Sequence, residues 1–156
     1  MPDRRTHDAV GTALGALAAV TRTKPEDGDA GAIIMLGGAV AGLVASHWPD
    51  VLEPAFCPSH RQLAHSVTTA GCVLSSGVHL TPQWEEQWRA VAVDLRNRQL
   101  RPDILPSDRL LLALLEMVAW MLVGAMAGAA AGYLSHLALD GTTPAGLPLL
   151  GSCASR

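Results

Sequence analysis

Two long stretches without a formally charged side chain constrain the fold more than any other feature of this chain. Residues 30–49 and residues 117–139 contain no Asp, Glu, Lys or Arg. An α-helix needs about 20 mostly apolar residues to cross the hydrocarbon core of a bilayer. Each stretch is therefore predicted to form a membrane-spanning helix.

Composition supports a membrane protein. Charged residues make up 16% of the chain, against roughly 25% in an average soluble protein. A third stretch, residues 66–84, also lacks these charges but is rich in Ser, Thr and Gly, so it is expected to cross only with protein neighbours. The alternative for this stretch is a buried helix of a soluble bundle. The length of 156 residues predicts a single domain, residues 1–156.

Net charge and cysteine spacing exclude two classes of function. The formal net charge of -3 provides no basic field for nucleic acid, so no nucleic-acid partner is expected. The three cysteines, Cys57, Cys72 and Cys153, show no CxxC spacing, which predicts neither a disulfide framework nor a thiolate zinc site.

Capping residues, prolines and glycines divide the chain into helices. The expected helices are residues 7–21 capped by Thr6, residues 30–47 closed by Pro49, residues 60–80, residues 82–100, and residues 107–139 opened by Ser107 and Asp108. The second helix is rich in glycine, which lets helix backbones approach closely inside lipid.

The segment 82–106 has the pattern of a helix lying at a bilayer surface. Trp84 and Trp88 fall on one side, and Glu85 and Arg89 fall on the other. An ordinary surface helix of a soluble protein is the alternative. We therefore expect an all-α, membrane-embedded antiparallel bundle of four main helices plus one amphipathic interfacial helix.

An antiparallel bundle would gather polar residues at one end. One side of such a bundle carries the start of the first helix, the end of the second, the start of the third and the end of the last. The polar residues on that side are His7, Asp50, Glu53, His60, Arg61, His65, His136 and Asp140. His136 and Asp140 lie one helical turn apart, so both can reach one divalent ion. The remaining histidines, His47 and His79, are predicted to be interface or packing residues.

Mixed nitrogen and oxygen ligands favour zinc or another borderline divalent cation. If one coordination position stays open, a bound water can ionise near neutral pH and attack an electrophile, which is hydrolase chemistry. Arg61 is predicted to hold an anionic oxygen such as that of a phosphoester.

These segments resemble a family of membrane-bound, metal-dependent hydrolases described as LexA-binding and inner-membrane-associated. The matching segments are Thr6-His7, Pro49-Asp50 with Glu53, His60-Arg61 with His65-Ser66, and Gly132-Tyr133 with His136, Asp140, Thr143, Gly146 and Pro148. Their order and spacing cover nearly the whole chain. The resemblance implies a location in the inner membrane, although nothing in the chain marks a LexA-binding surface.

The family is more distantly similar to the zinc-dependent phospholipase C and single-strand nuclease group. That resemblance implies that Asp50, His65, His136 and Asp140 surround one ion, with Asp140 bridging to a second ion near His7. The chain has no later His-x-x-x-Glu pair, and Glu53 stands where many relatives have Asp. We therefore expect one or two divalent cations rather than three.

The leading hypothesis is a multi-pass membrane hydrolase that acts on phosphoesters or phospholipids through a zinc-activated water. Glu53 or His60 would accept a proton from that water, and Arg61 would steady the developing charge. Membrane lipid is the expected partner, and a lipid or phosphoester the expected substrate. The alternatives are a non-catalytic, metal-stapled membrane protein that recruits a partner, and a divalent-cation transporter. The distribution of Lys and Arg weakly favours placing the site on the outer face.

Overall fold

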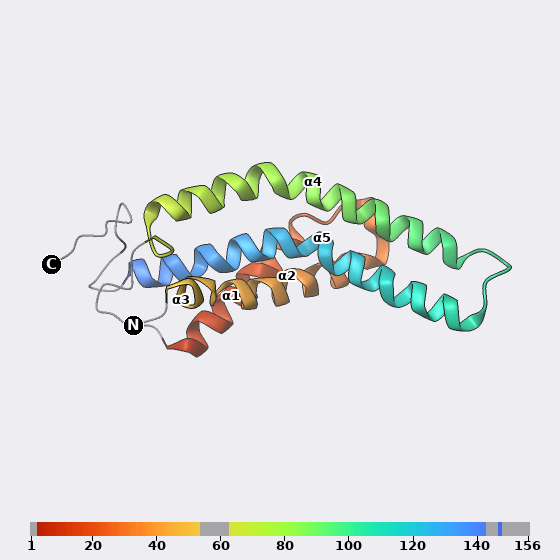
Figure 1. The fold of residues 1–156 in the computed structure, drawn as a ribbon, viewed down its shortest axis with the longest axis horizontal. Coiled ribbons are helices and arrows are strands. Elements are labelled where there is room, and N and C mark those ends of the chain that lie inside the picture. Colours follow the sequence, from red (N-terminus) through yellow and green to blue (C-terminus); the bar gives the residue numbers. More distant parts are fainter. Residues whose placement is uncertain (1–2, 54–62, 143–146, 148–156) are drawn as a thin grey trace.

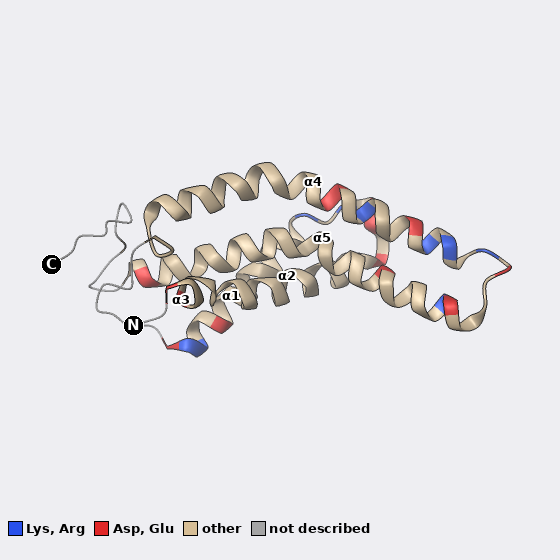
Figure 2. Cartoon of the chain, in the orientation of Figure 1, with Lys and Arg blue, Asp and Glu red and all other residues tan. Residues whose placement is uncertain are grey.

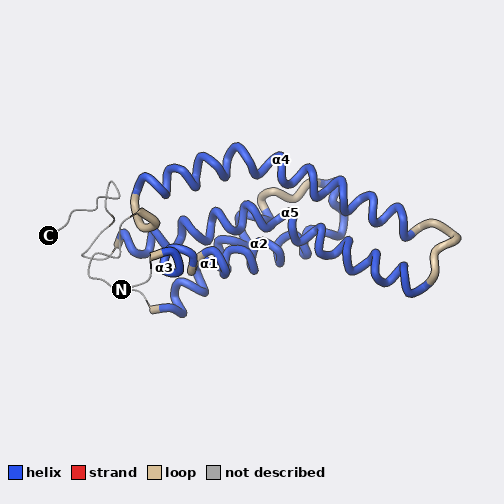
Figure 3. The backbone as a smooth tube through the Cα atoms, in the orientation of Figure 1, coloured by secondary structure: helices blue, strands red, loops and turns tan. Residues whose placement is uncertain are grey.

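The computed structural model of the chain describes residues 3–53, 63–142 and 147. These residues form helices joined by turns, with no strand among them (Figure 3). The elements in chain order are α1 (Arg4–Val20), the 3-10 helix η1 (Pro25–Ala30), α2 (Gly31–Ala45), α3 (Trp48–Leu52), α4 (Val67–Gln99) and α5 (Pro106–Gly141).

The long helices run side by side along the length of the molecule, and successive ones run in opposite directions (Figure 1). The helix α5 is central, because α1, α2 and α4 each pack against it. Helices α4 and α5 extend beyond the others as a helical hairpin, and many of the charged residues lie along this hairpin (Figure 2). We call the end of the molecule formed by this hairpin the hairpin end. The opposite end, where α1 begins and α5 ends, is called the site end.

Two helical segments are long and apolar enough to cross a membrane: Pro25–Leu52 and Pro106–Gly141. They contain the two charge-free stretches, so both predicted spans are confirmed as candidates. The 36 residues of α5 correspond to roughly 54 Å at 1.5 Å per residue. This length exceeds a hydrocarbon core of about 30 Å, so part of α5 must extend beyond it.

Glycines allow the backbones of α2 and α5 to touch. Gly124, Gly128 and Gly132 are spaced four residues apart and form a single face of α5. A Cβ atom added to any of the three would lie under 3.0 Å from a backbone atom of α2. Lipid is as apolar as leucine, so helices in a membrane associate through close packing of small residues rather than through the hydrophobic effect. This glycine face therefore holds α5 against α2.

The prediction of a separate amphipathic helix in the segment 82–106 is wrong, because α4 is one continuous helix of 33 residues with Pro82 inside it. An interior proline removes one backbone hydrogen bond and usually breaks a helix, which is why a break was expected. Here the helix continues while packing along α5, and Trp84 Nε1 donates a hydrogen bond to the Leu122 carbonyl at 2.6 Å.

The prediction that Glu85 and Arg89 lie on a solvent-facing polar side of this segment is also wrong. Glu85 and Arg89 are only 2% and 8% exposed. Arg89 Nε donates to Asp27 Oδ1 at 2.8 Å, and Arg22 Nε donates to Glu85 Oε1 at 2.8 Å. Periodicity placed these charges in solvent because it cannot detect ionic partners 62 and 63 residues away. The two ion pairs tie α4 to the connection between α1 and α2.

Replacing Arg89 with methionine should strongly destabilise the fold. The change would leave the buried Asp27 carboxylate without its guanidinium partner, which typically costs about 3–5 kcal/mol. The matched control is Arg98→Met, because Arg98 pairs with Asp94 on an exposed helix surface and such pairs contribute about 1 kcal/mol or less. Unfolding in detergent measures both variants, and equal losses of stability would contradict this account.

Helix ends differ from prediction in ways that shape the site. Asp3, not Thr6, caps α1, and its carboxylate accepts the Thr6 N–H at 2.8 Å. Pro49 does not end a helix but lies inside α3, which carries Asp50. The helix α4 begins at Val67 with Ser66 as its cap, so His65 lies in the preceding turn. At the other end of the chain, α5 starts at Pro106, after Leu105.

Candidate metal site

Three segments bring potential metal ligands together at the site end. His65 comes from the turn before α4, Asp50 from α3, and His136 and Asp140 from the last turns of α5. His65, His136 and Asp140 are at most 1% exposed, whereas the Asp50 side chain is 55% exposed. The site is therefore closed toward the bundle and open on the Asp50 side.

The ligand atoms have the separations that a small divalent cation requires. The Nε2 atoms of His65 and His136 are 3.4 Å apart, and Asp50 Oδ1 lies 3.4 Å and 3.6 Å from them. These three residues form a potential metal-binding group. Ligands held 2.0–2.1 Å from a tetrahedral zinc ion lie about 3.4 Å from one another. The geometry thus fits an ion of that size.

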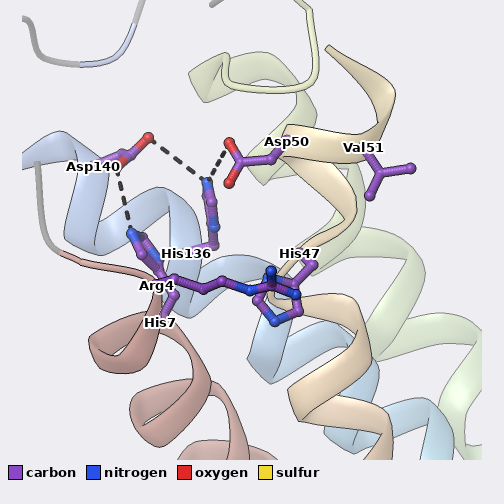
Figure 4. Close-up of a pocket in the computed structure, with 7 residues that line it drawn as sticks. All are labelled: Arg4, His7, His47, Asp50, Val51, His136 and Asp140. Atoms are coloured by element: carbon purple, nitrogen blue, oxygen red, sulfur yellow. Dashed lines mark ion pairs between the residues drawn. The ribbon is translucent and has the colours of Figure 1, made fainter. Parts of the chain in front are cut away.

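Asp140 supplies a fourth potential ligand atom, an oxygen, and contacts a further histidine. Its Oδ2 lies 3.8 Å from His65 Nε2 and 3.7 Å from His136 Nε2. Its Oδ1 lies 3.8 Å from His7 Nε2, and the His7 ring lies against the His136 ring with centroids 4.2 Å apart. One oxygen of the Asp140 carboxylate therefore faces His136 and the other faces His7 (Figure 4).

Glu53 and Tyr133 hold the turn that carries His65. Glu53 Oε2 lies 3.1 Å from His65 Nδ1, and Glu53 Oε1 accepts the Ala64 N–H at 2.9 Å. The Tyr133 hydroxyl donates to the Ala64 carbonyl at 2.7 Å. Metal-binding histidines commonly use their second nitrogen to contact a carboxylate, which fixes the ring and its tautomer. Glu53 is therefore placed to direct His65 Nε2 into the site.

Carboxylates raise the pKa of His65. Burial lowers this pKa, but hydrogen bonds with Asp50 and Glu53 and the nearby charge of Asp140 outweigh burial. The pKa of His65 consequently lies above the ordinary value of 6.5.

Metal affinity should fall as the pH drops below the pKa of His65. The imidazole must lose its proton to bind an ion, and the raised pKa of His65 extends this competition to higher pH than for an ordinary imidazole. Below the pKa, the affinity for zinc should decrease about tenfold per pH unit for this one proton. Competition titrations against a chelating dye between about pH 5.5 and pH 8 measure the slope. A constant affinity across this interval would contradict a role for His65 as a ligand.

A cavity of about 350 Å³ adjoins these ligands. Its described lining residues are Arg4, His7, His47, Asp50, Val51, His136 and Asp140 (Figure 4). Sequence reasoning did not select Arg4 and assigned His47 to packing. Helical spacing could have found Arg4, because residues three apart share a helix face and Arg4 precedes His7 by three residues within α1.

Two of the remaining predicted site residues fall outside the described part of the chain, and a third contacts a ligand without lining the cavity. His60 and Arg61, predicted to accept a proton and to hold an anion, fall outside the described residues, as do Thr143, Gly146 and Pro148. Glu53 contacts His65 but is not among the described residues that line the cavity. His79 is exposed on α4.

Comparison with known proteins identifies a family. Residues 1–151 match the family model described as YdjM inner membrane protein. The matched region includes all described residues of the site. No curated protein and no solved structure shows significant similarity to the chain.

Proposed function

Because the chain belongs to the YdjM inner membrane protein family, we propose that it is a multi-pass membrane protein whose helical bundle carries a metal-dependent hydrolase site. The two candidate spans support at least two crossings. In this proposal α1 and α4 complete an antiparallel membrane bundle, since both pack against the apolar α5.

The distribution of positive charge supports an orientation with the site on the outer side of the membrane. The hairpin end and its adjoining turn carry Arg22, Lys24, Arg89, Arg96, Arg98, Arg101 and Arg109. The described part of the site end carries Arg4 and Arg5. Cytoplasmic segments are enriched in Lys and Arg. A contact with LexA, which the sequence resemblance implies, would then have to use the hairpin end.

The convergence of ligand atoms from separate segments carries the proposal. Two histidines and two aspartates come from three separate segments of the chain, and their atoms lie 3.4–3.8 Å apart in the described pairs. A bound cation would offset the cost of removing the buried Asp140 carboxylate from water. Mixed nitrogen and oxygen donors favour zinc. His7 and the second oxygen of Asp140 provide a place for a second divalent ion.

An open site favours catalysis over a purely structural role. Structural zinc sites are closed by four protein ligands, whereas catalytic sites keep one position open. Here the potential metal-binding group has three members, His65, His136 and Asp50. Asp50 is exposed and borders the cavity, so an ion held by these three residues would keep a position open toward the cavity. A divalent ion at this position would supply Lewis acidity and lower the pKa of a bound water toward neutrality. In this proposal His65 and His136 hold the ion, and Glu53 orients His65.

The position of the cavity supports a phosphoester as substrate, and a phospholipid is the natural form that fits this position best. The cavity lies at one end of an apolar bundle, where lipid headgroups would be found. Arg4 lines it and provides a fixed positive charge, which suits an anionic substrate.

Metal-dependent turnover by the purified protein tests the proposal. Full-length protein in detergent would be stripped with a chelator, reloaded with zinc, manganese or magnesium, and assayed on phosphomonoesters, phosphodiesters and phospholipid vesicles. We expect one or two zinc ions per chain and hydrolysis that disappears with the metal. If bound zinc raised the melting temperature but no phosphoester were cleaved, the protein would be a metal-stapled module and not a hydrolase.

A further inference from the structure

We propose that Arg4 and His47 form a phosphoester-binding subsite in the cavity beside the metal ligands. Arg4 binds non-bridging oxygens of the phosphate, and His47, held by Asp8, donates a proton to the oxygen of the leaving alcohol. This inference rests on the proposed hydrolase function and adds two residues that sequence analysis did not assign to the site.

An aspartate from another helix fixes His47. His47 lies between α2 and α3, and its Nε2 is 2.6 Å from Asp8 Oδ1 of α1. Both side chains are partly exposed, with 25% of His47 and 37% of Asp8 accessible, and His47 lines the cavity. A carboxylate on one imidazole nitrogen sets the ring orientation. The other nitrogen, Nδ1, is then available to donate a proton.

Arg4 is the fixed cation among the described lining residues of a cavity that also contains Asp50 and Asp140. In the view of Figure 4 its side chain extends toward His47, while Asp50, His136 and Asp140 lie together on the other side. A planar guanidinium matches the geometry of two phosphate oxygens. A phosphate bound by Arg4 would thus lie between the metal ligands and His47.

This arrangement predicts the class of substrate. A proton donor accelerates cleavage only when the departing oxygen is strongly basic, as in an alkyl ester such as a glycerol phosphodiester. The oxygen of the attacking water forms a bond to phosphorus, and the bond between phosphorus and the ester oxygen breaks. The departing oxygen takes the bonding electron pair and the proton from His47. The attacking water loses one proton to solvent, and solvent returns a proton to His47, so the products are an alcohol and a phosphate with one ester fewer.

A comparison of leaving groups tests the role of His47. Zinc-loaded full-length protein and the variants His47→Gln and Asp8→Asn would be assayed on bis(p-nitrophenyl) phosphate, which has a good leaving group, and on diphenyl phosphate, which has a poorer one. We expect His47→Gln to lower kcat/KM for diphenyl phosphate by about 10²- to 10⁴-fold and for the nitrophenyl ester by less than about tenfold. Asp8→Asn should also lower kcat/KM selectively for diphenyl phosphate, but by a smaller factor than His47→Gln does. The control His79→Gln should change neither rate, because His79 is remote from the cavity lining.

Binding of inorganic phosphate tests the role of Arg4 without turnover. Calorimetry on the zinc-loaded protein should show that Arg4→Gln weakens phosphate binding about 10- to 100-fold, as expected for a lost charge-assisted hydrogen bond. Arg5→Gln is the matched control, since Arg5 is the neighbouring residue and is not among the lining residues. Zinc content should equal that of the wild type in every variant.

The outcomes separate this inference from the proposed function. If the wild type cleaves both esters and His47→Gln slows both equally, the hydrolase function stands and the proton-donor role fails. If Arg4→Gln binds phosphate as tightly as Arg5→Gln does, the subsite fails. If the wild type binds zinc but cleaves neither ester, the hydrolase function and the role of His47 fail together.

Discussion

His136→Ala is expected to abolish both stoichiometric zinc binding and hydrolysis while the bundle stays folded. His136 Nε2 lies 3.4 Å from His65 Nε2 and 3.6 Å from Asp50 Oδ1, so it contributes to the centre of the ligand group. Loss of a residue that merely orients a ligand typically costs about 10- to 100-fold in metal affinity or activity. Loss of the ligand itself should exceed about 100-fold in both.

The matched control for this change is His79→Ala, which removes an exposed histidine of α4. It should retain full zinc content and turnover. Metal analysis of the purified proteins, together with helix content by circular dichroism, measures both variants. A His136→Ala protein that kept its zinc and its activity would show that the ion, if present, binds elsewhere.

Gly128→Ala should strongly destabilise the bundle. A Cβ at this position would lie under 3.0 Å from three backbone atoms of Gly38 on α2. Backbone atoms cannot move aside as the end of a flexible side chain can, so the two helices must separate. Overpacking of a tight core typically costs about 1–3 kcal/mol and occasionally more, and we expect the upper end here because α5 is central.

Gly71→Ala is the control and should have the opposite sign. A Cβ at Gly71 of α4 would meet no atom within 4 Å. Alanine is a better helix former than glycine by about 0.5–1 kcal/mol, so this variant should be slightly more stable than the wild type. Thermal unfolding in one detergent compares the pair. Equal melting temperatures for the two variants would contradict the conclusion that the glycine face holds α5 against α2.

Helix ends explain how much of the site could be predicted. Prolines, glycines and polar caps approximately located the ends of the main helices. Alternation of direction then predicted that His7, Asp50, His65, His136 and Asp140 share one end, and the structure places them within one cluster. That prediction needed only the order of the helices and not the rotation of any helix about its axis.

Features that depend on rotation were missed. Glu85 and Arg89 look solvent-facing by periodicity, but they face ionic partners near the connection between α1 and α2. His47 was assigned to packing because nothing near it in the sequence indicates that Asp8 lies 2.6 Å away across the α1–α2 contact. Contacts of this kind become visible only when the helices are packed, because they join residues that are distant in the chain.

The most direct test of the central claim is X-ray absorption spectroscopy of the zinc-loaded protein at the zinc edge. We expect a first shell of nitrogen and oxygen alone at about 2.0–2.1 Å, with the outer-shell scattering of two imidazoles from His65 and His136. This result would place two histidines from distant segments on one ion. A shell that contained sulfur, or one without imidazole scattering, would contradict the account.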